Sequence, residues 1–350
     1  MKHGGNVYEN KVNMDFSVNL NPLGIPPEIS DALQRSLDNA GRYPDPAQND
    51  VRSSIAHALK LDKDCVYAGS GASQLILASV MALTPSKALL FEPGFSGYRH
   101  VLSAAGCPVL SHLLSEENGF AITKEDLKAL SPDTDLVFVC DPINPTGLNV
   151  RDDVLYKLLE RAASYHTAVI LDESFYLMSD KASDGFTDRS AKLLSEFDNL
   201  YIIRSLTKLL AVPGVRIGYA LSDPANIDKL IMQLPEWNLS AAGEEAIKAG
   251  MKLITKTDLI SKTVKVILNE RDFLRTGLKD MGLTVFDSNS LYILFRGPVG
   301  LYDRLLEKGI LIRDCSDIPG LGPGFYRIAV KTHEDNEILM EAVRGTVNGK

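Results

Sequence analysis

The chain has 350 residues, of which 45% are hydrophobic and 23% charged, a composition that fits one large globular domain or two smaller ones. Its formal net charge of −8 argues against nucleic acid or an anionic membrane as a partner, and no apolar run reaches the roughly 18 residues that a membrane span needs. The four cysteines form no Cys-x-x-Cys pair and the six histidines form no metal-ligand cluster, so we expect no metal site. The N-terminal sequence shows no export signal and the cysteines are scattered, so we expect a cytoplasmic protein with free thiols.

The predicted elements begin with a turn and helix start at "NPLGIPPE", within a segment that we expect to pack on the C-terminal part of the chain. The stretch "AGSGASQ", residues 68–74, follows a short strand and opens a helix. Short apolar runs then alternate with helical patterns such as residues 154–165. The runs predicted as buried strands are "DLVFVC" at 135–140, "AVILD" at 168–172 and "LYIIR" at 200–204.

The pattern changes past about residue 241, where a long helical region continues to about residue 281. After it come the strands "LYILF", "ILIR" and "YRIAV", a helix near 302–308 and a terminal helix. We therefore predict an α/β fold with a doubly wound, mostly parallel sheet of the seven-stranded type, and a smaller α+β domain. The expected boundaries are an N-terminal segment at 1–44, a large domain at 45–240, and an inter-domain helix with the small domain at 241–350.

Polar side chains follow the predicted strands at the points where the strands end. Asn144 comes after the first of the three strands, Asp172 closes the second, and Lys208 follows the third, with Ser205 and Thr207 beside it. Ligands of open parallel sheets bind beyond the carboxyl ends of the strands. The sequence thus predicts a crevice with an amide, a carboxylate, an amine and, at "AGSGASQ", an anion cradle.

Taken singly, these features have ordinary explanations. A strand-end Asp often caps a helix, "NPTG" is a common turn, and a lone lysine is usually solvated. "GSG" is not the dinucleotide fingerprint, because Ser73 and Gln74 stand where its third glycine is needed, and the Gly-Lys-Ser/Thr ending of a nucleotide P-loop is missing. Small residues at a helix N-terminus still suit a phosphate.

The stretch "SLTKLLAVPGVRIGYA" places Lys208 and Arg216 in an apolar neighbourhood. A lysine must be neutral to attack a carbonyl, and burial beside another cation lowers its pKa. Ser205, Thr207 and Arg216 have the chemistry to hold a phosphate dianion next to that amine, and a carboxylate on another strand has the chemistry to pair with a ring nitrogen. These are the parts that pyridoxal phosphate requires.

The chain resembles the fold-type-I pyridoxal-phosphate enzymes of the class I/II aminotransferase superfamily nearly end to end. The resemblance rests on "NPLG", "RYPDP", "GSGAS", "PGFSGY", "DPINPTG", "DESF", "SLTK", "PGVRIGY", "ILIR" and "YRIAV". Within the superfamily it is similar to histidinol-phosphate aminotransferases and to threonine-phosphate decarboxylases of cobamide synthesis. The opening "HGGN", followed by "DFSVNLNPLG", resembles the decarboxylases more closely.

The resemblance implies a role for each matching residue. Lys208 would bind the cofactor covalently and shuttle protons, Asp172 would pair with the pyridine nitrogen, and Phe95 would lie against the ring with Tyr98 nearby. The other implied cofactor contacts are Asn144 at the ring 3-oxygen, and Gly71, Ala72, Ser73, Ser205, Thr207, Arg216 and a partner subunit's copy of Tyr43 at the phosphate. The implied substrate contacts are Arg327 for the α-carboxylate, Arg313 for a second anion, and Asn21, Leu23, Gly24 and His3. A homodimer with shared active sites follows from the role of Tyr43.

Two residues depart from the common pattern of the superfamily. Phe175 stands where many aminotransferases carry a tyrosine that contacts the 3-oxygen, and the decarboxylase relatives also tend to have phenylalanine there. Leu291 stands where relatives often carry an asparagine. Arg313 and Arg327 have an alternative interpretation as surface ion-pair residues. The segment around His3 either is a disordered start or folds over the substrate phosphate.

We expect decarboxylation of a small phosphorylated amino acid, with transfer of an amino group from a histidinol-phosphate-type amine to 2-oxoglutarate as the alternative. The outcome depends on which bond at Cα stands perpendicular to the cofactor ring. A ligand-sensing domain of a regulator is disfavoured, because such domains usually carry an attached DNA-binding module and this chain is acidic. A nicotinamide-dependent reductase is disfavoured by the missing third glycine.

Overall fold

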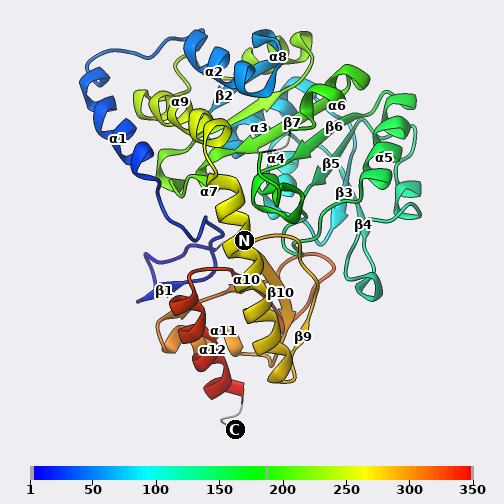
Figure 1. Ribbon diagram of the computed structural model, residues 1–350. Coiled ribbons are helices and arrows are strands. Elements are labelled where there is room, and N and C mark those ends of the chain that lie inside the picture. Colours follow the sequence, from blue (N-terminus) through cyan, green and yellow to red (C-terminus); the bar gives the residue numbers. More distant parts are fainter. Residues whose placement is uncertain (1–3, 187, 348–350) are drawn as a thin grey trace.

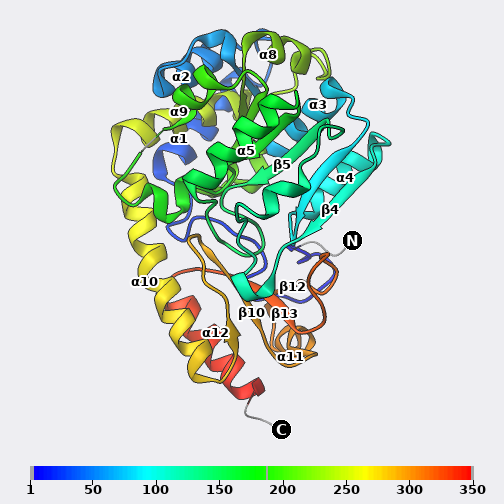
Figure 2. The ribbon, with the colours of Figure 1, turned by 90° about the vertical axis from the view of Figure 1, so that its right-hand side faces the viewer.

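The computed structural model describes residues 4–186 and 188–347. A large part and a smaller part lie one above the other, and the helix α10 (Leu259–Asp280) runs from one to the other (Figure 1). Figure 2 shows α12 (His333–Val347) beside the lower half of α10, on the side of the small part away from the large sheet.

The large part is built on a seven-stranded sheet, which confirms the predicted fold class. Its strand order is β2-β8-β7-β6-β5-β3-β4, and only β8 runs antiparallel to its neighbours. The strands are β2 (Val66–Gly69), β3 (Ala88–Glu92), β4 (Val109–Leu113), β5 (Leu136–Cys140), β6 (Ala168–Asp172), β7 (Leu200–Ser205) and β8 (Gly218–Leu221).

Both faces of this sheet are covered, because alternate residues of each central strand enter different apolar clusters. In β6, Val169 and Leu171 pack with α5 (Asp152–Ser164), whereas Ala168 and Ile170 pack with α3 (Ala72–Leu83). The other helices of the large part are α1 (Pro27–Ser36), α2 (Asn49–Leu59), α4 (Ser96–Ala104), α6 (Ser190–Glu196), α7 (Leu206–Leu209), α8 (Pro224–Ile231) and α9 (Ala241–Lys256). Burial on both faces explains the nearly continuous apolar strands of the sequence.

The small part contains a four-stranded sheet of order β12-β13-β10-β9 and the helix α11 (Leu301–Glu307). Its strands are β9 (Thr284–Val285), β10 (Tyr292–Arg296), β12 (Arg313–Asp314) and β13 (Phe325–Ala329). β1 (Met14–Asp15) pairs with β11 (Ile310–Leu311) beside this sheet, so this strand near the start of the chain lies with the small part. α1, in contrast, packs on α9. The boundaries at 44 and 240 stay a prediction.

Two expected elements are divided in the structure. The helical region at 241–281 breaks into α9 and α10, because Thr257 is extended and its hydroxyl accepts a hydrogen bond from the Leu259 N–H. The "ILIR" strand splits into β11 and β12, which pair with different partners, β1 and β13. Over the described residues, no helix has the length and apolarity to cross a membrane, and His, Cys, Asp and Glu form no metal-binding group.

Candidate active site

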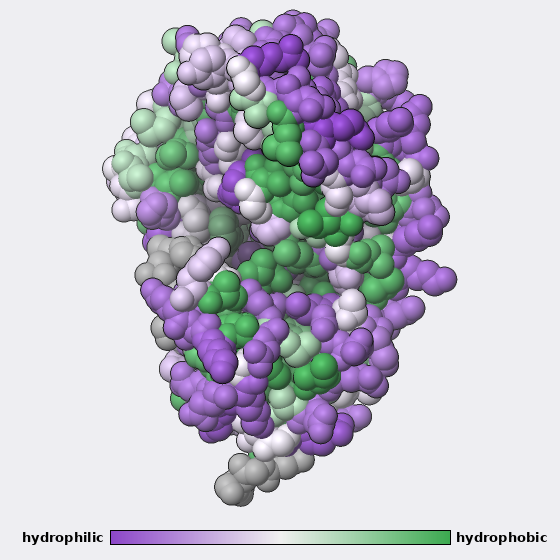
Figure 3. All heavy atoms as spheres, turned by 90° about the vertical axis from the view of Figure 1, so that its left-hand side faces the viewer, coloured by the Kyte–Doolittle hydropathy of each residue, from purple (hydrophilic) through white to green (hydrophobic). Residues whose placement is uncertain are grey.

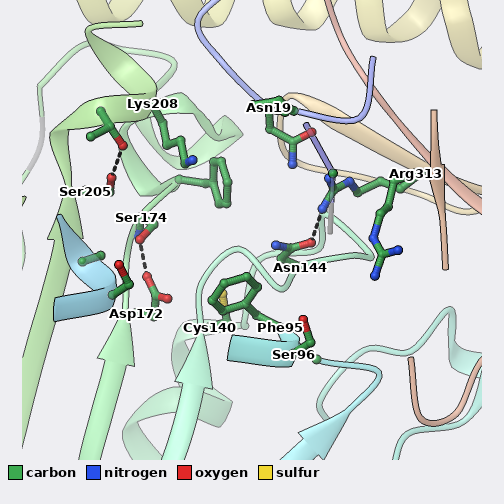
Figure 4. Close-up of a pocket in the computed structure, with 18 of the residues that line it drawn as sticks. Asn19, Phe95, Ser96, Cys140, Asn144, Asp172, Ser174, Ser205, Lys208 and Arg313 are labelled. Atoms are coloured by element: carbon green, nitrogen blue, oxygen red, sulfur yellow. Dashed lines mark hydrogen bonds between the residues drawn. The ribbon is translucent and has the colours of Figure 1, made fainter. Parts of the chain in front are cut away.

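A cavity of about 270 Å³ lies beyond the carboxyl ends of the central strands, between the two parts of the chain. Figure 4 shows the Lys208 side chain entering it from one side and Arg313 from the other. The structure brings together, as lining residues, most of those predicted from the sequence: Ala72, Ser73, Phe95, Asn144, Asp172, Ser205, Thr207, Lys208, Arg216, Arg313 and Arg327.

Lys208 lies on α7, the short helix that follows β7 directly. Burial, reinforced by the charges of Arg216 and Arg327, lowers the pKa of its amine to about 8, while the charge of Asp172 acts in the opposite direction. At neutral pH a useful fraction of the amine is therefore unprotonated and able to attack a carbonyl.

Replacing Lys208 by methionine is expected to raise the free energy of unfolding of the cofactor-free protein near neutral pH by about 1–3 kcal/mol, because a buried charge is removed. The pKa of Lys208 is about 8 in the folded chain, against an ordinary value of 10.5. The gain in the free energy of unfolding is therefore largest below pH 8, where the lysine is charged in both states. It falls as the pH rises towards 10.5, where both states are neutral. Thermal unfolding of both proteins across this range measures it, and a gain that grows with pH would contradict it.

An anion cradle forms at the N-terminus of α3. Gly71 caps the helix at a φ of 83°, and a Cβ there would come within 2.9 Å of Arg216 Nη2. Arg216 Nη2 donates to Ser73 Oγ at 3.2 Å, and the Ser205 and Thr207 hydroxyls lie 2.7 Å apart. A helix N-terminus with a guanidinium and hydroxyls around it fits a phosphate dianion.

Arg216 itself has a φ of 57°, in the left-handed region that non-glycine residues rarely adopt. Strain of this kind persists where the surroundings hold it, and it clusters at binding sites. The left-handed backbone conformation of Arg216 is therefore consistent with a binding role for its side chain in the anion cradle.

Asp172 ends β6 with its carboxylate buried. The Tyr98 hydroxyl donates to Oδ2 at 2.7 Å, and the Ser174 N–H donates to Oδ1 at 2.9 Å (Figure 4 shows the Ser174 contact). Burial raises the pKa of Asp172, whereas these two donors lower it. A carboxylate has about four acceptor sites, so it keeps capacity for a further donor from the cavity. This fits the protonated ring nitrogen of pyridoxal phosphate.

Phe95 lies edge-on to the Tyr98 ring, with the centroids 5.3 Å apart, and lines the cavity on the side of the Cys140 thiol. Phe175 also lines it and packs edge-on against Tyr292. With Lys208, the Asp172 carboxylate and the anion cradle, these rings complete a cavity whose residues fit pyridoxal phosphate.

Arg313 and Arg327 face each other as paired residues of the antiparallel strands β12 and β13. Arg327 donates to Asn144 Oδ1 and to the Ser17 carbonyl, both at 2.6 Å, and its buried Nε has no hydrogen-bond partner within residues 4–186 and 188–347. Arg313 donates to the Asp314 carbonyl and, through Nη2, to Asp317 Oδ1 at 2.9 Å. The two guanidinium groups thus enter one cavity from a single sheet.

Several predicted residues lie outside the cavity. Asn21 donates from its side chain to the Leu209 carbonyl and to the Thr263 hydroxyl, and its N–H reaches the Lys208 carbonyl at 3.0 Å, so it supports the turn that carries the lysine. Leu23 and Gly24 follow it without lining the cavity, and Leu23 is exposed. The Tyr43 ring packs on Trp237 and is 78% exposed. His3 lies outside the described residues.

Asn19 is the most informative residue that sequence reasoning missed. It is 4% exposed and lines the cavity, and its Oδ1 has no hydrogen-bond partner among the described residues (Figure 4). Buried amide oxygens are usually paired, so Asn19 Oδ1 has the capacity to accept a hydrogen bond from a molecule in the cavity. The other lining residues not predicted as site residues are Gly4, Ser17, Val18, Ile76, Gly94, Ser96, Cys140, Ser174, Phe175 and Ile318.

Comparison with known proteins agrees with this geometry. A family model described as aminotransferase class I and II matches residues 11–343. The threonine-phosphate decarboxylase of Salmonella typhimurium is 32% identical, over 99% of this chain and 97% of its own. A histidinol-phosphate aminotransferase of Methanothermobacter thermautotrophicus is also 32% identical, over 93% and 86%. The structure of a histidinol-phosphate aminotransferase from Clostridium acetobutylicum superposes with a TM-score of 0.87 at 29% identity, covering 96% of this chain and 100% of that one.

Proposed function

The chain belongs to the aminotransferase class I and II family, and we propose that it is a decarboxylase of an O-phosphorylated amino acid, with threonine phosphate as the first substrate to test. It is an enzyme of the pyridoxal-phosphate-dependent class, and its cofactor is pyridoxal 5′-phosphate. The proposal concerns the reaction, the substrate and the roles of individual residues.

The observation that carries the proposal is the pair of arginines at one register position of β12 and β13. Residues directly opposite each other on antiparallel strands project from the same face of the sheet. Arg327 has the planar fork that suits a carboxylate, and Arg313 supplies a second cation on the same side. Two anion-binding groups in one cavity fit a substrate with both a carboxylate and a phosphate.

The remaining lining residues would hold the cofactor. Its phosphate would bind in the anion cradle, formed by Gly71, Ala72, Ser73, Ser205, Thr207 and Arg216. Phe95 would lie against its ring, and the side-chain amide nitrogen of Asn144 would donate a hydrogen bond to the ring 3-oxygen. Asp172 would accept a hydrogen bond from the ring nitrogen and stabilise its protonated form. When bound, pyridoxal phosphate accepts the electron pair that remains at Cα after a bond there breaks.

In the proposed reaction the Cα–carboxylate bond breaks, carbon dioxide leaves, and a proton takes its place at Cα. Lys208 would deliver that proton, because an amine whose pKa is about 8 both gains and loses protons readily near neutral pH. Arg327 and Arg313, by binding the two anionic groups of the substrate, would hold it in one orientation, and that orientation would determine which bond at Cα breaks.

The test is to supply the cofactor-loaded protein with O-phosphothreonine and to follow carbon dioxide and keto acids. We expect release of carbon dioxide, formation of the phosphorylated amine and no keto acid. O-Phosphoserine tests whether the methyl group matters, and threonine without phosphate tests the contribution of Arg313. Formation of a keto acid, or no reaction with any phosphorylated amino acid, would reject the proposal.

The second candidate is amino transfer from histidinol phosphate to 2-oxoglutarate. It is favoured by the fold similarity and 29% identity to the Clostridium acetobutylicum histidinol-phosphate aminotransferase. In that reaction Arg313 would bind the phosphate of the amine, and Arg327 would bind a carboxylate only in the half-reaction with the keto acid. Transfer of the amino group to 2-oxoglutarate, without release of carbon dioxide, identifies it.

Replacing Asn19 by alanine is expected to raise the KM for the phosphorylated substrate about tenfold, because the unpaired amide would be lost as a substrate contact. Stability should change little, since Asn19 Oδ1 makes no hydrogen bond to any residue that the structure describes. Steady-state kinetics and thermal unfolding measure both effects. Asn21→Ala is the matched control: it loses bonds to Leu209 and Thr263 and should lower stability instead. An unchanged KM in Asn19→Ala would contradict the assigned contact.

The proposed assembly is a cytoplasmic homodimer with shared active sites. Figure 3 shows hydrophobic side chains gathered in the middle of the face that carries α1, next to a hollow. The large exposed apolar residues between positions 20 and 44 are Leu23, Ile25, Leu37 and Tyr43, and the last is the one expected to reach the partner's cofactor phosphate. Exposed apolar patches commonly mark interfaces. Sedimentation of the loaded protein measures the oligomeric state directly.

A further inference from the structure

The strand ends that form the active site also carry a buried group of charged residues on the opposite face of the sheet. We call Asp141, Glu173, Arg189 and Arg204 the ionic cluster. Asp141 and Glu173 are fully buried, and Arg204 is 2% exposed. None of the four lines the cavity.

Arg189 lies between the two carboxylates of this cluster. Its Nη2 donates to Asp141 Oδ2 at 2.6 Å, and its Nε donates to Glu173 Oε1 at 2.8 Å. Arg204 donates from Nε to the other oxygen of Glu173, at 2.8 Å, and from Nη2 to Asp188 at 2.7 Å. A planar guanidinium with donors in fixed directions sets the separation of the groups that it joins.

Three residues of the ionic cluster are sequence neighbours of residues that line the cavity, at the ends of the central strands. Asp141 follows Cys140 of β5, and Glu173 follows Asp172 of β6. Successive side chains of a strand point to opposite faces, so the cluster forms on one face and the active site on the other.

The third strand repeats the arrangement, since Arg204 precedes Ser205 in β7. Backbone hydrogen bonds continue the pairing at these ends, from Asp141 N–H to the Asp172 carbonyl at 2.9 Å and from Glu173 N–H to the Ile203 carbonyl at 2.8 Å. The three strand ends are therefore joined both by the backbone and by the cluster.

Asp141 also anchors the turn that presents Asn144. Its Oδ1 accepts hydrogen bonds from the Val150 N–H at 3.0 Å and from Asn149 Nδ2 at 2.8 Å, which closes the segment from 141 to 150. Arg189 therefore connects the turn that carries Asn144 to the strand that carries Asp172.

We propose that Arg189 is a positioning residue, which fixes Asp172 and Asn144 relative to each other for cofactor binding by bridging Asp141 and Glu173. Without its guanidinium, the cationic partners left among the described residues would be Lys181 for Asp141, with Nζ 3.3 Å from Oδ2, and Arg204 for Glu173. The cation that joins the two buried carboxylates would be lost, and the strand ends would separate or recruit water. This inference rests on the proposed roles of Asp172 and Asn144.

The experiment compares Arg189→Met, Arg189→Lys and the matched control Arg52→Met. The Arg189 and Arg52 side chains are 17% and 13% exposed, and Arg52 also binds an aspartate, Asp64 at 3.0 Å. Arg52 bonds in addition to the carbonyl of Val66, at the start of β2, at the end of the sheet away from the cavity. The cofactor-free proteins are titrated with pyridoxal phosphate by fluorescence quenching, and thermal unfolding is recorded for each.

We expect Arg189→Met to weaken cofactor binding at least about tenfold and to lower kcat further, since misplacement of site residues by an ångström can cost a hundredfold. Arg189→Lys, which keeps the charge without the fork, is expected to lie in between. Arg52→Met is expected to lose thermal stability while it keeps the affinity of the unmodified protein.

The inference is overturned if Arg189→Met binds the cofactor as tightly as the unmodified protein, or if Arg52→Met loses as much affinity as Arg189→Met does. Should Arg189→Met fail to fold, Arg189→Lys decides the matter in the same titration, and unchanged affinity there rejects the role. Failure of the unmodified protein to bind pyridoxal phosphate would instead refute the proposed function itself.

Discussion

Lys208→Ala is expected to lower kcat/KM by about ten-thousandfold, because one amine would be lost both as the covalent attachment point of the cofactor and as the proton donor at Cα. The cofactor phosphate would still find its cradle at the N-terminus of α3, so the variant should retain noncovalent cofactor binding. The absorption band of covalently bound pyridoxal phosphate should disappear, and borohydride followed by peptide mapping should find no label on this segment.

Lys87→Ala provides the control for that substitution. Lys87 pairs with Asp133 on the surface, at 2.7 Å, and lies outside the cavity, so the spectrum and the activity should stay unchanged. If the absorption band persisted in Lys208→Ala and another lysine carried the label, Lys208 would not be the attachment point of the cofactor. Both candidate reactions, as proposed here with Lys208, would then be contradicted.

Asp172→Asn has the second largest expected effect. An amide keeps the size of the side chain and can still accept a hydrogen bond from the Tyr98 hydroxyl, but it lacks the charge that stabilises a protonated ring nitrogen. We expect kcat to fall by about 10²–10³-fold with a smaller change in KM, because the lost interaction strengthens as charge develops in the transition state. Stopped-flow spectra and steady-state kinetics measure the two effects.

Two comparisons make the result specific. Asp172→Glu retains the charge but displaces it, so it should recover part of kcat if charge matters more than position. Tyr98→Phe removes one donor from the carboxylate, and burial would then raise the pKa of Asp172 further. A kcat within about tenfold of the unmodified enzyme in Asp172→Asn would contradict a ring-protonating role for this residue.

The sequence predicted the central part of the site because regular elements determine where those residues lie. Asn144, Asp172 and Lys208 each stand at or just after the end of an apolar strand, and parallel strands bring their carboxyl ends to one edge of a sheet. The alternation of strand and helix predicted the sheet itself, which the structure confirms with seven strands. These inferences needed only local patterns.

Residues on irregular backbone were harder to predict. Asn19 and Asn21 lie two residues apart in a segment without periodicity, and only tertiary packing directs one to the cavity and the other to α7. Arg189 is separated by 16 residues from Glu173, one of the two carboxylates that it joins, and no spacing rule relates them. The break at Thr257 depends on one hydroxyl contact that competes weakly with the helix.

The distribution of charge around the cavity has a consequence for how small molecules reach it. Among its lining residues four are basic (Lys208, Arg216, Arg313 and Arg327) and one, Asp172, is acidic, although the whole chain carries a formal charge of −8. The positive charge of the cavity lining should attract small dianions, whereas the net negative charge of the whole protein should repel large polyanions. Substrate capture should slow as ionic strength rises, and sulfate and inorganic phosphate should compete for entry.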